Sequence, residues 1–343
     1  MVETHEPLTS SVVDEGKPMA SWRRAVSAVG GQNISLFVAL GLLIAVIGVQ
    51  NGNLFLPQNL TTIGTSVAIL GIIAIGQTVV MIAGGLDISV GSEAGVASVV
   101  CAMVFTSSGS AILGVVVAIG IGAVLGLFNS VVIVYGRVHA VIATLATFAG
   151  FRGIANLVSD GRSQGYVGSD TMFVFLSRGS ILGIPVLIWV LVVVALLVHV
   201  MLRYTDLGRN AYAIGGNDIA ARLSGINLNR YIVGVYVLMG LISAVAGVLL
   251  TARTGSGQPT SGSQGLELAS ITAAALGGCA LQGGKGTVLG TILAVLLLGV
   301  MTNGLTILGV NAFWQDIAQG ALLVIAVMIQ QKRIGSRAVG LPA

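Results

Sequence analysis

Charged residues are scarce in this chain. Only 8% of its 343 residues are Asp, Glu, Lys or Arg, while 55% are hydrophobic. A soluble globular domain carries about 25% charged residues, and the mean hydropathy here is +0.99. This composition excludes a water-soluble protein with a large polar surface. It indicates an integral membrane protein. Because roughly ten spans of about 20 residues would occupy most of the chain, we expect no sizeable soluble domain.

Cysteine and aromatic residues are also few. Cys101 and Cys279 lie in apolar segments with no neighbouring Cys or His at metal-ligand spacing, so we expect both to be buried and inert. Aromatics make up 5% of the chain, whereas glycine is abundant at 49 residues. That usage is typical of helices that pack closely on small residues in lipid, and the Gly122/Gly126 spacing is compatible with such a contact.

Motifs for catalysis and nucleotide binding are missing as well. The segment GGCALQGGKGT lacks the phosphate-binding pattern, because Cys279 takes the first glycine position and Gly286 follows Lys285 where Ser or Thr is needed. The sequence shows no nucleophilic triad, metal cluster or paired catalytic carboxylates. Its basic residues are scattered, and the net charge is only +4, so we expect no nucleic-acid partner. Any energy source other than an ion gradient must come from another chain.

The apolar residues that are present gather in long runs. They predict an all-α membrane protein of about ten transmembrane helices, because about 20 apolar residues span a bilayer. The runs are 34–49, 60–83, 88–106, 111–135, 139–159, 184–202, 231–252, 268–281, 287–308 and 312–330. Residues 1–33 are expected to be a disordered cytoplasmic tail, 34–330 the transmembrane domain, and 331–343 a cytoplasmic C-terminal tail.

The positions of Lys and Arg predict the orientation, because cytoplasmic loops carry an excess of them. With the N-terminus inside, both termini and the polar loop 203–230 are cytoplasmic. The cytoplasmic side then holds Arg23, Arg24, Arg137, the loop arginines, Lys285 and the C-terminal cluster, while the outside receives only Arg152, Arg162, Arg178 and Arg253. A count of nine helices would leave one basic terminus outside.

Four polar side chains within or beside the spans are candidates for a solute pathway, because polar groups at membrane depth are usually functional. They are Gln77, Asp87, Asn129 and Asn303. Asp87 belongs to the glycine-rich break GGLDISVGSE, where it or Ser89 can instead cap the following helix. Each amide can equally serve as a hydrogen bond between helices. Both interpretations stay open.

Four segments in order resemble a known family. They are LGRNAYAIGGNDIAARLSGINLNRY, GGLDISVGS, GLELASITAAALGG running into QGGKGTVLGT, and NGLTILGVNAFWQDIAQGALLVIAV. They look like the permease subunits of bacterial ABC importers for ribose, xylose, arabinose, galactosides and related solutes. The resemblance implies a ten-helix permease in the bacterial plasma membrane, in contact with lipid, that dimerises with a second copy or a homologous permease. It also implies a cytoplasmic ATPase that holds ATP and Mg, an extracytoplasmic sugar-binding protein, and no cofactor on this chain.

The same resemblance implies a coupling helix in the loop 203–230 that docks on the ATPase. The loose family pattern is E-A-A-x-x-x-G, and Ala220, Ala221 and Gly225 fit it, while Ile219 takes the Glu position. Asn217 or Asp218 can cap such a helix and Gly225 can end it. The predicted docking residues are Gly215, Asn217, Asp218, Ala220, Ala221, Arg222 and Gly225.

Two other classes of function remain open from the residues alone. An ion-coupled secondary transporter or a channel for a small polar solute needs no ATPase, although the chain of membrane-embedded acids and histidines expected for proton coupling is lacking. A membrane enzyme needs a reactive constellation that the sequence does not show.

Overall fold

The chain is almost entirely helical. The computed structural model describes residues 31–334; the predicted tails 1–33 and 331–343 therefore lie largely outside the described residues. Its elements are α2 (Gly31–Gln50), η1 (Gly52–Phe55), α3 (Pro57–Ile82), α4 (Val90–Ser108), α5 (Ala111–Val134), α6 (Ala140–Ser159), α7 (Thr171–Arg178), β1 (Ser180–Ile181), β2 (Ile184–Pro185), α8 (Val186–Tyr204), α9 (Asp206–Gly216), α10 (Asp218–Leu223), α11 (Leu228–Thr254), α12 (Leu266–Leu276), α13 (Val288–Ile307) and α14 (Ala312–Ile334).

Ten apolar helices lie within residues 31–334. Eight are long and apolar enough to cross a bilayer, namely α2, α3, α4, α5, α6, α8, α11 and α13, and two are shorter, α12 and the apolar part of α14 over Ala312–Met328. The all-α membrane fold is thus confirmed. The run predicted over 268–281 forms a helix only to Leu276, because two glycines follow and Gly278 adopts φ +97°, a left-handed conformation that ends the helix.

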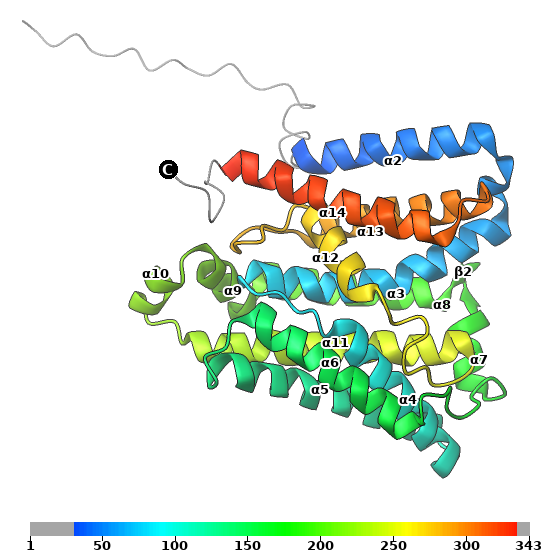
Figure 1. Ribbon diagram of the computed structural model, residues 1–343, viewed down its shortest axis with the longest axis horizontal. Coiled ribbons are helices and arrows are strands. Elements are labelled where there is room, and N and C mark those ends of the chain that lie inside the picture. The colour runs from blue at the N-terminus through cyan, green and yellow to red at the C-terminus, as the bar shows by residue number, and fades with distance from the viewer. Residues whose placement is uncertain (1–30, 335–343) are drawn as a thin grey trace, which may run out of the picture.

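The connections lie at opposite ends of the helix bundle. Figure 1 shows α9 and α10 at the same end as the start of α2 and the end of α14, while α7 and the hairpin β1–β2 lie at the other end. The expected long loop at 160–183 is partly ordered: Asp170 caps α7, accepting hydrogen bonds from the amides of Met172 and Phe173 at 2.9 and 3.1 Å. The loop 203–230, the start of α2 and the end of α14 therefore share one side of the bundle. That this side faces the cytoplasm stays a prediction.

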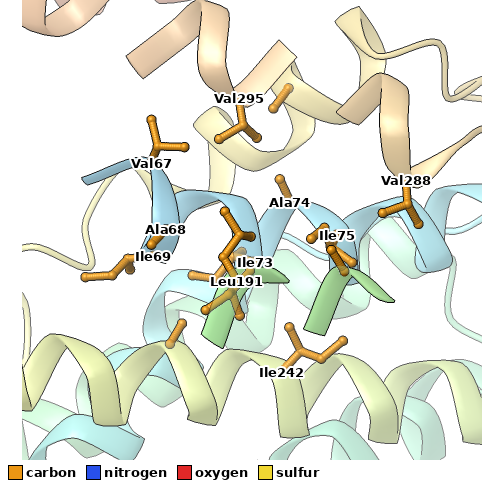
Figure 2. Close-up of a cluster of buried hydrophobic side chains, with 14 of the residues drawn as sticks. Val67, Ala68, Ile69, Ile73, Ala74, Ile75, Leu191, Ile242, Val288 and Val295 are labelled. Atoms are coloured by element: carbon orange, nitrogen blue, oxygen red, sulfur yellow. The ribbon is translucent and has the colours of Figure 1, made fainter. Parts of the chain in front are cut away.

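Helix α3 is the centre of the bundle. In its apolar, membrane-length stretch, 83% is buried, against 11% for α2 at the periphery. A helix that is apolar all round and buried on every side is a core helix. Figure 2 shows its side chains packed against Leu191 of α8, Ile242 of α11, and Val288 and Val295 of α13.

Helices α5 and α11 approach each other on glycines. A methyl group on Gly240 of α11 would overlap the carbonyl oxygen of Gly122 and would lie 2.9 Å from the amide nitrogen of Gly126. Small residues allow this backbone approach in membranes, so the Gly122/Gly126 pair does serve as a helix contact.

Candidate functional site: two short loop helices and a buried helix break

The loop 203–230 folds into two short helices, each with a polar cap. Thr205 precedes α9, and its hydroxyl accepts from the amide of Gly208 at 3.4 Å. Asn217 precedes α10, and its side-chain oxygen accepts from the amide of Ala220 at 2.9 Å. Gly225, with φ +82°, follows the end of α10. The cap and the end foreseen for a short helix are both present, and α9 is an additional element.

Helix α10 has an outward face that the family pattern does not describe. Ile219 is 68% exposed and Leu223 is 85% exposed, one turn apart, although both are apolar. Of the predicted docking residues, Asn217, Asp218, Ala220, Arg222 and Gly225 are exposed beside them. Sequence reasoning treated Ile219 as a departure from the pattern and missed Leu223; the signal was two apolar residues four apart in a polar loop.

Two of the predicted docking residues lie against other parts of the bundle rather than at its surface. Ala221 is 4% exposed and packs in a small cluster with Ile214 and Leu228. Gly215, at the end of α9, lies against the last turn of α3, where a methyl group would overlap the carbonyl oxygen of Ile82. Docking by the set as a whole remains a prediction.

The second part of the site is the break between α3 and α4, whose residues 83–89 are not helical. Non-helical backbone inside a membrane domain must find hydrogen-bond partners within the protein. In the amide orientation that satisfies its neighbours, Gln77 donates to the carbonyl of Asp87 at 3.1 Å and accepts from its amide at 3.2 Å. The carbonyl of Leu86 accepts from the hydroxyls of Thr144 and Tyr236, each at 3.3 Å. Side chains from α3, α6 and α11 thus hold the break.

Two carboxyl groups lie buried at this break. Asp87 Oδ1 accepts from the amide of Ser89 at 2.8 Å and from its hydroxyl at 2.6 Å. Asn129 of α5 donates from Nδ2 to Ser89 Oγ at 2.8 Å and to Glu93 Oε1 at 3.0 Å. All four side chains are inaccessible to solvent. Among residues 33–328, whose side chains the structure describes, Asp87 Oδ2 has no hydrogen-bond partner, and the only ion pair is that of Arg209 with Asp206.

A cavity of about 240 Å³ adjoins the break. It is lined by Gly84, Gly85, His139 and Tyr236 together with apolar side chains of α3, α5, α6 and α11. Its lining offers few polar groups, so it is open space beside the break rather than a polar binding site.

The structure brings three of the four pathway candidates together. Gln77, Asp87 and Asn129 form one hydrogen-bonded group around Ser89. Asn303 of α13 lies elsewhere and exchanges two hydrogen bonds with Asn59 of α3, at 3.0 and 2.8 Å. That pairing is a link between helices. A role in the pathway stays a prediction for all four.

The chain is similar to several transport proteins. The family described as "Branched-chain amino acid transport system / permease component" matches residues 59–327. The ribose import permease protein RbsC of Escherichia coli (strain K12) is 38% identical over 298 residues, 86% of this chain and 92% of that protein. RbsC of Bacillus subtilis (strain 168) is 39% identical over 302 residues, 88% and 94%. The L-arabinose ABC transporter permease protein AraH of Azospirillum brasilense is 35% identical over 296 residues, 86% of each. No solved structure matches the chain.

Proposed function

The chain belongs to the family described as branched-chain amino acid transport system permease components, and we propose that it is the membrane-spanning subunit of an ABC importer for a sugar. One observation carries the proposal: 35–39% identity over 86–88% of the chain with ribose and arabinose permeases. The family description names amino acids, whereas these relatives, matched over nearly their whole length, are named for pentoses. We therefore favour a pentose or a similar polyol as the solute. A multi-pass position in the bacterial inner membrane follows from this class and from the apolar helices.

The energy source in this proposal is a separate ATPase that binds ATP and Mg. Support comes from the absence of a phosphate-binding motif in the sequence and from the exposed apolar residues of α10. Ile219 and Leu223 project from a polar end of the bundle, with Asp218 and Arg222 alongside. Apolar side chains rimmed by charges suit a protein partner better than water or lipid headgroups. The complete importer would further need a sugar-binding protein at the opposite end and a second permease.

The transport mechanism in this proposal is alternating access driven by the ATPase. A partner can shift a conformational equilibrium only by binding one state more tightly than the other. Helix α10 is the natural place for that difference to act, because its outward apolar residues, Ile219 and Leu223, are largely exposed. Closure of the ATPases on ATP would displace α10, and hydrolysis would release it.

Reconstitution tests the proposal directly. Proteoliposomes containing this chain, its ATPase and the binding protein are expected to take up pentose in an ATP-dependent way that an ionophore does not abolish. The chain alone is expected to be inactive. Pentose uptake by the chain without any ATPase would contradict the proposal and favour an ion-coupled transporter or a channel.

Variants of α10 test the docking surface. Burying a leucine or isoleucine contributes about 1.5–3 kcal/mol, so Ile219→Asp or Leu223→Asp should weaken ATPase binding by at least about ten-fold. Asn229→Asp, at an exposed position beyond α10, is the control with the same added charge. Normal ATPase binding by both α10 variants would place the docking surface elsewhere.

A further inference from the structure

Three glycine-bearing segments meet at the end of the bundle that carries α10. They are Gly84 after α3, Gly215 at the end of α9, and Gly283–Gly284 in the connection from α12 to α13. A methyl group on Gly283 would lie 2.7 Å from the Cα atom of Gly215 and 2.8 Å from that of Gly84. The three backbones therefore touch each other with no side chain between them.

Hydrogen bonds fix this contact on both sides. The amide of Gly284 donates to the carbonyl of Ile82, in the last turn of α3, at 2.9 Å. The hydroxyl of Tyr212 in α9 donates to the carbonyl of Gly286 at 2.8 Å. Burial raises the pKa of the Tyr212 hydroxyl, so it keeps the proton that it donates. The connection 277–287 is thus tied to both α3 and α9.

The contact lies between the two parts of the candidate site. Gly215 is two residues before Asn217, the cap of α10, and Gly84 is three residues before Asp87. Side-chain contacts can yield by rotamer changes, but backbone contacts cannot. Any displacement of α10 that moves the end of α9 must therefore move the segment 84–89 or open the contact.

We propose that Gly215 is a positioning residue of the transport cycle, which passes displacement of α10 through backbone contact to the α3–α4 break and to the α12–α13 connection. The inference rests on the proposed function, because it requires an ATPase that moves α10. Glycine is needed at this position for its lack of a side chain: the backbone of Gly215 is not left-handed, yet a methyl group would overlap Ile82 and lie 2.6 Å from the amide nitrogen of Gly284.

The neighbouring glycine provides a matched control. Gly216 ends the same helix with a backbone that is also not left-handed, and a methyl group there would meet nothing within 4 Å. Gly215→Ala and Gly216→Ala therefore differ only in whether the new methyl group enters the contact.

The experiment measures pentose uptake per ATP hydrolysed by the complete importer in proteoliposomes. Gly215→Ala should keep ATPase binding and hydrolysis while uptake per ATP falls at least about ten-fold, within the range of couplings between distant sites. Gly216→Ala should match the wild type. Equal uptake per ATP in both variants would overturn the inference. Loss of ATPase binding by Gly215→Ala, with the fold intact, would also overturn it and make Gly215 a docking residue.

Two further measurements do not depend on the folding of Gly215→Ala. Tyr212→Phe keeps the ring but removes the hydrogen bond to Gly286, and it should lower uptake per ATP in the same direction. In the wild-type importer, amide hydrogen exchange of segments 82–89 and 280–286 should change when an ATP analogue closes the ATPases. Unchanged exchange in both segments would overturn the inference. A wild-type chain that transports without an ATPase would instead overturn the proposed function, and the inference with it.

Discussion

Replacement of Asn129 by leucine removes the amide that joins α5 to the buried carboxyl group of Glu93. Two hydrogen bonds are lost, to Ser89 Oγ at 2.8 Å and to Glu93 Oε1 at 3.0 Å. Hydrogen bonds between membrane helices contribute on average about 0.6 kcal/mol and at most about 1.7, because the unfolded chain in lipid also finds partners. The two together predict a loss of about 1–3 kcal/mol in the free energy of unfolding.

Asn303→Leu is the matched comparison. It also removes two hydrogen bonds, those with Asn59 at 3.0 and 2.8 Å. Asn303 is partly exposed, and the Asn59 amide already donates to the carbonyl of Leu54 at 3.0 Å. Its loss should therefore fall at the lower end of the range. In Asn129→Leu, by contrast, Glu93 Oε1 loses its 3.0 Å donor and keeps the longer 3.4 Å contact with Ser89.

Equilibrium unfolding of the purified chain in mixed micelles, with increasing denaturing detergent, measures both losses on one scale. Asn129→Leu should lose more stability than Asn303→Leu. A loss below about 0.5 kcal/mol for Asn129→Leu, under the membrane average for one hydrogen bond, would refute the idea that this amide stabilises the helix break. An equal loss of stability in both variants would refute the idea that burial makes the hydrogen bonds of Asn129 contribute more than those of Asn303.

Two other variants follow from helix packing and capping. Gly240→Ala should lower the free energy of unfolding by about 1–3 kcal/mol, as overpacking does, because the methyl group would overlap the carbonyl oxygen of Gly122. Thermal unfolding in detergent measures this loss, with Gly234→Ala as the control, because a methyl group on Gly234 has its nearest contact at an ordinary 3.5 Å. Equal melting temperatures of the two variants would contradict the prediction. Asn217→Ala removes the cap of α10, which should lower the stability of that helix by about 1 kcal/mol and weaken ATPase binding about five-fold, as measured by titration. Asn217→Ser keeps a capping side chain and should bind the ATPase normally. Equal ATPase binding by both variants would contradict the role of the cap.

The helices could be predicted because their signal is local. Runs of apolar residues long enough for a bilayer define α3, α5, α11 and most of the others. The end of α12 at Leu276 was harder, since the apolar composition continues to Leu281 and only the conformation of Gly278 stops the helix. Composition gives the location of a membrane helix, while glycine geometry decides its last turn.

The pairings within the site could not be predicted, because they are long-range. Asn129 contacts Ser89, which is 40 residues away in the sequence. Gly84, Gly215 and Gly283 contact one another although they lie in three separate segments of the chain. Neither contact leaves a period in the sequence. The inward position of Ala221 could not be predicted either, because a six-residue helix is too short for its faces to be read from hydrophobic spacing alone.

The helix break and its buried acids stabilise each other. The first amides of α4 have no partner within their own helix, and Asp87 accepts a hydrogen bond from one of them, the amide of Ser89. Glu93 lies in the first turn of α4, where the helix dipole favours a carboxylate. In a continuous helix the amide of Ser89 would donate to a backbone carbonyl, and Asp87 would lose that donor. The break is in turn required where Gly84 meets Gly215 and Gly283, because a helical turn with side chains could not enter that contact. The polar residues of GGLDISVGSE thus follow from the same close approach that joins this break to α9 and the α12–α13 connection.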